Sequence, residues 1–324
     1  FSVYAVGFYN QENLFDTCHD EGKKDYEYLP NKGWNGMKYT NKLRNMSKAL
    51  ADMGTDVLPT VGCAFIGLSE VENHKVLDAL VDQAPLKARN MKYVHIEGPD
   101  RRGIDCALLY NPSLFSVKNV KLLPYVQELA KDSAFFTRGF LTVRGEMAGD
   151  DVAVIVCHWP SRFSGPFYRE SAARQVKVIK DSLLNVNQEM KIFVMGDMND
   201  DPVNKSMHVY LQAKPEISQV GAGDMYNPWY NVLAKEGKGT LFYSGNWNLF
   251  DQIVITPNLL NKDAKKKDYS SLKYWKSHIF RRDYLIQQEG QYKGAPLRTT
   301  AGGRWLNGYS DHLPVVMYLV KEKK

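Results

Sequence analysis

Short apolar runs and longer amphipathic stretches alternate along the whole chain. Residues 37–54 and 168–189 repeat apolar side chains at a spacing near 3.6, which predicts two long helices, and residues 73–83 predict a shorter one. Gly54, at the end of the first stretch, is typical of the position just past a helix. Apolar runs of strand length lie at 2–9, 64–68, 104–110, 152–159, 191–196, 250–256 and 313–320. These runs are apolar on both faces, which favours sheets that are covered on each side.

The predicted helices and strands follow one another without an evident linker. One large layered domain over residues 1–324 is therefore favoured over two domains. The sequence has no low-complexity tract, no fixed-period repeat and no apolar run long enough to cross a bilayer. It begins with Phe1 instead of Met, and a removed secretory signal is one explanation. On that ground we favour export to the periplasm or the outside of the cell. We also expect a monomer.

Polar side chains recur where these strands begin or end. They are Asn10, Glu12, Glu70, Glu72, His158, Arg162, Asp197, Asn199, Asp251, Asp311 and His312. Any one such boundary is explained by the preference of Asp and Asn for turns. Six boundaries that share carboxylates, amides and imidazoles favour a common site, where crowded carboxylates would repel one another. A hard cation would relieve that repulsion. Oxygen ligands without thiolates favour Mg²⁺ or Mn²⁺, with Ca²⁺ as an alternative, over zinc.

Imidazoles beside such a cation indicate phosphoryl chemistry, because both can neutralise charge on a phosphoryl group. Asp197 could take a proton from water or hold the water in line, and Asn199 could orient that pair. Asp251 is the candidate partner that would fix the tautomer of His312 and favour its charged form.

Seven motifs carry a resemblance to a known family. In chain order they are FYNQENLFD, GLSEVEN, RRGIDCALLY, CHWPSR, GDMNDDP, NLFDQIVI and SDHLPVV. Together they span nearly the whole chain, and they resemble the endonuclease–exonuclease–phosphatase superfamily. The resemblance implies an α+β fold, a four-layer α/β/β/α sandwich of two packed mixed β-sheets flanked by helices. It places the active site at loops on one edge of the sheets.

The resemblance also implies roles for individual residues. Asn10 and Glu70 match an amide and a principal glutamate at the metal, Asp311 matches an acid beside it, and Glu12 falls where some relatives place a second acid. The residues with catalytic matches are His158, which binds phosphate, Asp197 and Asn199, which act on the attacking water, and the Asp251–His312 pair, which stabilises the transition state. Arg102 and Arg162 are candidates for substrate phosphate, with a solvated turn as the alternative for each.

The net charge of +6 (42 basic minus 36 acidic residues) is concentrated in residues 261–305. This segment holds eleven Lys or Arg and four acids, interleaved with aromatic residues, and resembles an insertion before the SDH motif. It favours either a surface for a polyanion or a solvated insertion. We therefore expect a divalent-metal-dependent phosphodiesterase, with a nuclease on DNA or RNA as the leading hypothesis. The alternative is a phosphatase or sphingomyelinase-type enzyme on inositol phosphates or lipid headgroups. A non-catalytic binding module is disfavoured because every motif residue is retained.

Overall fold

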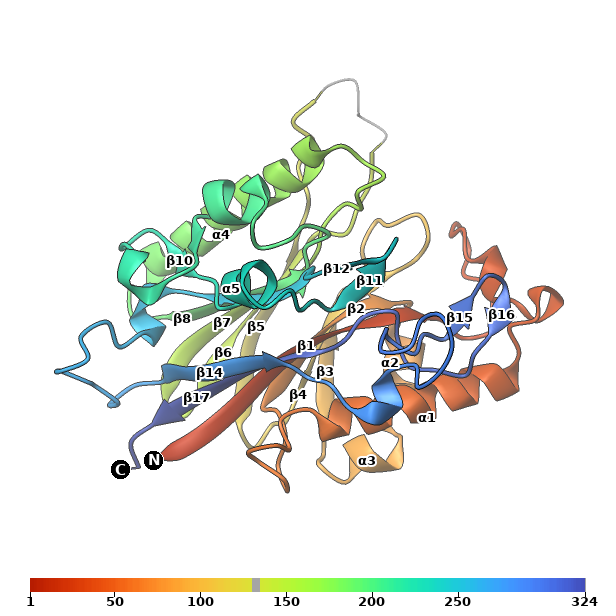
Figure 1. Ribbon diagram of the computed structural model, residues 1–324, viewed down its shortest axis with the longest axis horizontal. Helices are drawn as coiled ribbons and strands as arrows, with labels where there is room; N and C mark the ends of the chain where they lie inside the picture. Colours follow the sequence, from red (N-terminus) through yellow and green to blue (C-terminus); the bar gives the residue numbers. More distant parts are fainter. Residues whose placement is uncertain (130–134, 324) are drawn as a thin grey trace.

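The computed structural model describes residues 1–129 and 135–323, and two β-sheets packed face to face form its centre (Figure 1). One sheet has six strands in the order β14 (Lys273–Ile279), β17 (Val315–Lys321), β1 (Ser2–Leu14), β2 (Phe65–Val71), β4 (Asp105–Tyr110) and β3 (Lys92–His95). The other has seven strands in the order β5 (Phe115–Leu123), β6 (Phe140–Met147), β7 (Asp150–His158), β8 (Lys191–Asp197), β13 (Asp251–Ile255), β10 (Met225–Tyr226) and β9 (Ala213–Lys214). Both sheets mix parallel and antiparallel pairs.

Helices cover the outer face of each sheet. The six-stranded sheet carries α1 (Gly36–Asp52), α2 (His74–Val81) and α3 (Ala84–Lys87), and the seven-stranded sheet carries α4 (Pro166–Val186). The short α5 (Trp229–Ala234) sends its Trp229 into the core between the sheets. These layers confirm the expected four-layer α/β/β/α sandwich. Among the described helices, none is long and apolar enough to cross a membrane.

Alternation along β1 explains why its sequence is apolar on both faces. Val6 and Phe8 belong to the core between the sheets, whereas Ala5 and Tyr9 belong to the core under α1 and α2. Gly67 of β2 lies where the sheets approach closely, since an added Cβ would stand 2.6 Å from Met195 Sδ. The close packing of the two sheets therefore holds their strand ends in fixed relative positions.

The helices begin and end where local sequence signals predict. The Asn35 side chain accepts from the backbone N–H of Lys38 at the start of α1, and Gly54 follows the helix with φ +82°. The Asn73 side chain caps α2 in the same manner, by accepting from Lys75 and Val76. Asn73, the last residue of the GLSEVEN motif, therefore has a structural role.

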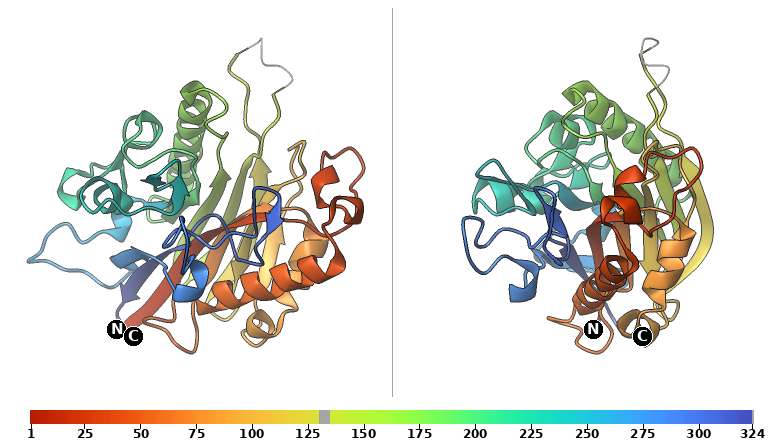
Figure 2. Two further views of the ribbon diagram at one scale, coloured as in Figure 1. Left: turned by 45° about the vertical axis from the view of Figure 1, so that its right-hand side comes forward. Right: turned by 90° about the vertical axis from the view of Figure 1, so that its right-hand side faces the viewer.

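Smaller elements complete the fold around the two sheets. Two hairpins, β11 (Leu241–Tyr243) with β12 (Asn246–Asn248) and β15 (Thr300–Ala301) with β16 (Arg304–Trp305), and single helical turns complete the fold. The turns are η1 (Tyr26–Tyr28), η2 (Pro30–Lys32), η4 (Ser206–Tyr210), η5 (Ile217–Gln219), η6 (Pro257–Leu259) and η7 (Asp283–Leu285). The two chain ends lie side by side because β1 and β17 pair antiparallel, with Ser2 opposite Lys321 (Figure 2).

The basic segment 261–305 is divided by the fold. Its residues 273–279 form β14, the edge strand beside β17, so this part belongs to the sheet. The loop that precedes β14 projects on the left of Figure 1, whereas β15 and β16 lie on the right. The basic residues of this segment are therefore distributed before, within and after strand β14.

Candidate active site

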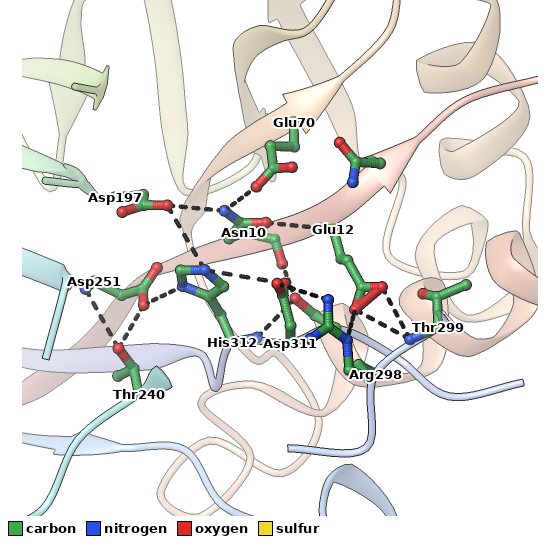
Figure 3. A network of polar contacts seen from close by, with 12 residues as sticks. Asn10, Glu12, Glu70, Asp197, Thr240, Asp251, Arg298, Thr299, Asp311 and His312 are labelled. Atoms are coloured by element: carbon green, nitrogen blue, oxygen red, sulfur yellow. Dashed lines mark hydrogen bonds and ion pairs between the residues drawn. The ribbon is translucent and has the colours of Figure 1, made fainter. Parts of the chain in front are cut away.

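Four strands deliver polar side chains to one edge of the sandwich (Figure 3). Asn10 comes from β1 and Glu70 from the neighbouring parallel strand β2. Asp197 ends β8, Asp251 begins β13, and the two are register partners in that antiparallel pair. The Asn10 amide joins the sheets, because its Nδ2 donates to Glu70 Oε2 at 2.5 Å and to Asp197 Oδ2 at 3.0 Å. Residues far apart in the sequence thus meet at one place, as predicted.

The backbone beside this cluster is unusual. Glu12, Asn13, Glu70 and Asn199 all have φ between 43° and 60°. A left-handed conformation costs a non-glycine residue roughly 1–2 kcal/mol. The ladder between β1 and β2 also shifts register between Asn10 and Leu14. These irregularities turn side chains out of the usual strand alternation, and backbone of this kind is typical of functional sites.

His312 is held by Asp251. Its Nδ1 lies 2.7 Å from Asp251 Oδ2, which also accepts from the Thr240 hydroxyl. Burial alone would lower the pKa of His312, but the surrounding carboxylates, above all Asp251, raise it well above its ordinary value. The carboxylates therefore favour the charged form of His312. Its Nε2 lies 3.8 Å from Asp197 Oδ2, toward the space that the carboxylates share.

His158 has the opposite electrostatic character. Its Nε2 lies 3.6 Å from Asp197 Oδ2, and its Nδ1 has no hydrogen-bond partner within residues 1–129 and 135–323. Burial lowers the pKa of His158 well below its ordinary value, and the charges of Arg138, Arg102 and His312 act in the same direction. The site thus favours the charged form of His312 and the neutral form of His158, and both imidazoles lie beside Asp197.

Asp197 lies at the centre of the cluster. Its Oδ1 accepts from the backbone N–H of Asn199 at 3.0 Å, and its Oδ2 faces Asn10 and both imidazoles. Burial raises the pKa of Asp197 to about 7, although the charge of His312 opposes the rise. The Asn199 amide donates to the Trp159 carbonyl at 2.8 Å, so this residue holds the turn and steadies Asp197 through its backbone.

The donor set at this edge fits a hard cation. Glu70, His158 and Asp197 offer ligand atoms within 4.8 Å of one another, as do Asp197, Asp251 and His312. In the second group, His312 and Asp251 are already hydrogen-bonded to each other. Glu70 and Asp197 are therefore the carboxylates that remain available to bind a cation. Carboxylate oxygens without thiolates are the ligands that Mg²⁺ and Mn²⁺ prefer. Asn10 turns its Nδ2 to both acids, while its Oδ1 accepts from the Glu12 backbone at 2.8 Å. In this arrangement Asn10 acts as a donor to the acids.

Glu12 lies outside the cluster, contrary to the expectation of a second metal acid. Both of its carboxylate oxygens accept from the Thr299 backbone N–H at 3.1 Å, and Arg298 Nε lies 3.9 Å away. The reason is the left-handed backbone at Glu12, which directs its side chain toward the 298–300 segment (Figure 3). Asp311 stays near the site, with Oδ1 3.9 Å from His312 Nε2 and Oδ2 3.5 Å from Arg298 Nη2.

The two arginines predicted for phosphate differ in position. Arg102 Nη2 lies 3.9 Å from Glu70 Oε1 and donates to Asn13 Oδ1, so its half-exposed guanidinium borders the cluster. Arg162 donates to the Asn199 carbonyl and to Asp201, and it packs over the Phe250 ring at 4.7 Å. These contacts of Arg162 hold the turn after β8, and they do not involve Glu70.

Sequence reasoning missed three residues that shape the site. Thr240 holds Asp251, Arg298 contacts Asp311, and Arg138 donates to Asp100 at 3.0 Å and to the Trp159 carbonyl. Arg298 was visible only as one of eleven basic residues. Thr240 and Arg138 carry no sequence signal, because neither belongs to a motif. Thr240 reaches the start of strand β13, and Arg138 reaches the loops that hold Asp100 and Trp159.

Comparison with known proteins identifies the same architecture elsewhere. A family model described as the endonuclease/exonuclease/phosphatase family matches residues 5–321. The mannosyl-6-phosphatase Bt3783 of Bacteroides thetaiotaomicron is 14% identical, with a TM-score of 0.59 over 98% of this chain and 99% of that one. An endonuclease/exonuclease/phosphatase family protein of the same organism is 14% identical, with a TM-score of 0.58 over 99% of both chains.

A TDP2 structure from D. rerio, complexed with a single-strand DNA product, is also similar. It is 11% identical, with a TM-score of 0.57 over 98% of this chain and 99% of that one. None of the curated proteins searched matches the sequence. The TM-scores demonstrate a common fold. Because the identities are low, the substrate has to be argued from the site itself.

Proposed function

Because the chain belongs to the endonuclease/exonuclease/phosphatase family of metal-dependent phosphoester hydrolases, we propose that it hydrolyses phosphodiester bonds in DNA or RNA. The observation that carries this proposal is the shared environment of three side chains. Glu70 and Asp197 share the Asn10 amide, and the Nε2 of His312, whose charged form Asp251 favours, lies 3.8 Å from the same Asp197 oxygen. This combination places negative and positive groups where a phosphoryl group and a water molecule would meet.

Each residue of the cluster then has a distinct role. Glu70 would hold the divalent cation, with Asp311 nearby, and the bound cation would polarise a phosphoryl oxygen. Asp197 would accept a proton from the attacking water, for which a pKa of about 7 is well matched to neutral pH. His312 would donate its Nε2 proton to a phosphoryl oxygen, because Asp251 fixes its Nδ1–H and its charge. His158 would offer a second, neutral contact to the phosphoryl group.

Two cavities that border the cluster support a substrate larger than a phosphate. A cavity of about 730 Å³ is lined by Asp311, Arg298, Tyr243 and Tyr292 among others. A second, of about 250 Å³, is lined by Asn13 and by aromatic and basic residues. Both cavities are lined by the 298–305 segment, so there is room beside the site for a substrate that extends beyond the phosphate, as a nucleic acid does. The D. rerio TDP2 structure with its DNA product is compatible with the same class.

The position of the basic loop favours a second candidate. Asp251 pairs with Asp197 at the site, while Ile255 pairs with Phe193 further along the sheet, so the chain leaves β13 at the opposite end. The four steps from Asp251 to Ile255 span about 13 Å at roughly 3.3 Å per strand residue, and residues 261–267 follow beyond that end. This loop therefore adds no charge at the active site. A smaller phosphoester, such as a sugar phosphate, an inositol phosphate or a lipid headgroup, needs no extended basic surface and is the second candidate.

A substrate panel with a metal series separates the candidates. The purified chain would be incubated with single- and double-stranded DNA, RNA, mannose 6-phosphate, inositol phosphates and sphingomyelin vesicles. Each would be tested with Mg²⁺, Mn²⁺, Ca²⁺ and EDTA, with Asp197→Asn as the inactive control. Metal-dependent cleavage of a nucleic acid supports the proposal, and turnover of only a small or lipid phosphoester supports the second candidate. No metal-dependent turnover of any of these substrates would refute both.

A further inference from the structure

We propose that the cleft between Tyr28 and Trp305 binds a nucleobase of a nucleotide next to the scissile phosphate. This inference rests on the proposed nuclease function and adds a specificity subsite to it. The cleft lies between the η1–η2 segment and the β15–β16 hairpin, which neighbour each other on the right of Figure 1. It is the 250 Å³ cavity that borders the cluster on the side of Asn13.

The lining of the cleft suits a flat, heteroaromatic ring. Tyr28, Trp34 and Trp305 supply aromatic surface, and the Thr300 hydroxyl adds a polar group beside them. Tyr28 stacks on Phe15 with ring centroids 4.1 Å apart, and Trp34 Nε1 donates to the Phe15 carbonyl. These contacts fix two of the three aromatic side chains before any ligand arrives. Fixed aromatic surfaces bind bases in single-stranded nucleic acids largely independently of sequence.

The charge of the cleft favours a base over a second phosphate. Lys32 and Lys38 line it, but so do Glu27 and Glu12, which gives a balanced rim. Lys38 Nζ donates to the Gly33 carbonyl and lies 5.6 Å from the centre of the Trp305 ring. A rim without excess positive charge offers donors and acceptors to a base edge.

The cleft is connected to the reaction centre by direct contacts. Asn13 lines the cleft and accepts from Arg102, whose Nη2 lies 3.9 Å from Glu70 Oε1. A phosphate near Glu70 and Arg102 would therefore lie beside the mouth of the cleft, and the attached nucleoside could enter it. Glu12, which accepts from the Thr299 and Thr300 backbone, holds the β15–β16 hairpin at this mouth.

Another tryptophan provides a matched control. Trp275 on the edge strand β14 is about half exposed, and Lys276 Nζ lies 4.3 Å from the centre of its ring. Trp275 and Trp305 thus share an accessible ring and a neighbouring lysine, but only Trp305 lines the cleft. Any general effect of removing such a tryptophan should appear in both variants.

The experiment measures binding of short single-stranded oligonucleotides by fluorescence anisotropy in EDTA, so that no cleavage occurs. A series of oligonucleotides carries one abasic nucleotide at successive positions. The position at which each oligonucleotide of the series is cleaved is mapped separately, with active enzyme and metal. Wild type should lose about tenfold or more in affinity when the base at one position beside the cleaved bond is removed. Trp305→Ala should bind intact oligonucleotide as weakly as wild type binds that abasic one, and should not respond further to it. Trp275→Ala should behave like wild type.

The outcomes separate this inference from the proposed function. If wild type neither binds nor cleaves any oligonucleotide, the nuclease proposal fails and the subsite fails with it. If wild type cleaves but Trp305→Ala responds to abasic substitution as Trp275→Ala does, only the subsite is refuted. Trp305→Phe keeps an aromatic ring and should restore most of the affinity, which guards against a folding defect in Trp305→Ala. Quenching of 2-aminopurine at the sensitive position in wild type provides a test without any substitution, and its absence would contradict the stacking.

Discussion

The Glu12 carboxylate accepts hydrogen bonds from the Thr299 backbone N–H at 3.1 Å through both oxygens, and so ties β1 to a segment 287 residues away. The same segment is held by Lys42 of α1, whose Nζ donates to Thr299 Oγ1 and to the Tyr309 carbonyl at 2.5 Å each. Arg298, the residue before Thr299, donates to Asp311. Glu12 and Lys42 therefore position the loop that carries the last acid and the histidine of the site.

Glu12→Gln should change the pH dependence of stability in the metal-free protein. Burial, reinforced by the charge of Asp311, raises the pKa of Glu12 from 4.5 to about 7. Between pH 4.5 and 7 the folded state keeps this proton, whereas the unfolded state loses it. The stability that protonation contributes is therefore fully present below pH 4.5 and is lost as the pH rises through 7. The rise corresponds to about 3 kcal/mol at most. Melting temperatures measured in EDTA from pH 5 to 8 should fall less steeply for Glu12→Gln than for wild type.

Glu289→Gln is the control, because Glu289 is an exposed acid in the segment that leads to Thr299, the partner of Glu12. Its pH profile should follow that of wild type. Parallel profiles for wild type and Glu12→Gln would contradict the raised pKa and the positioning role that rests on the buried contact.

Asp251→Asn should lower kcat by about 10² to 10⁴ with the fold retained. The Nδ1 of His312 would lose its anionic partner at 2.7 Å, so the imidazole would be less often charged and less firmly oriented. Removal of this carboxylate should also lower the pKa of His312, since Asp251 is the main group that raises it. Activity assays test the first expectation and an NMR titration of the His312 ring tests the second. A normal kcat, or an unchanged His312 titration, would remove Asp251 from this role.

The polar residues at the strand ends could be predicted from the sequence, because they depend on the local order of apolar and polar positions. Apolar runs indicated where β1, β2, β8 and β13 lie, and the polar residues that follow marked the rim. The Asp251–His312 contact was inferred in the same way, and its geometry is as expected. Roles of individual residues in catalysis stay predictions until variants are assayed.

Other features depended on information that a pattern does not contain. The side chain of Glu12 points away from the cluster because its backbone is left-handed, and nothing in an Asn-Gln-Glu-Asn run announces that conformation. Strand β5 was missed because its burial alternates irregularly at the edge of a sheet. Strand β14 lies within the basic segment, and the pattern of charges did not reveal it. Strand pairing is a property of the whole chain.

Gly67→Ala should destabilise the sandwich by about 1–3 kcal/mol. The new methyl group would stand 2.6 Å from Met195 Sδ and 3.0 Å from the Phe8 ring, in the core between the two sheets. Gly36→Ala at the start of α1 is the control, because no atom lies within 4 Å of its added Cβ. Urea denaturation of both variants measures the difference. Equal stability of Gly67→Ala and wild type would show that the sheets can separate locally without cost.

Glu70→Gln should abolish the stabilisation of the folded chain by Mg²⁺ or Mn²⁺. A cation that binds only the folded state raises its stability by about 2.7 kcal/mol when present at a hundred times its Kd. Glu70 offers the carboxylate that lies beside both Asn10 and Arg102, and a neutral amide would bind a hard cation far more weakly. Glu72→Gln is the control two residues away, because Glu72 Oε2 accepts from the Asp16 backbone. Thermal unfolding with and without each cation should show the metal-dependent shift in wild type and Glu72→Gln only. A shift of normal size in Glu70→Gln would mean that the cation is held by other residues, and the assignment of Glu70 as the principal ligand would be wrong.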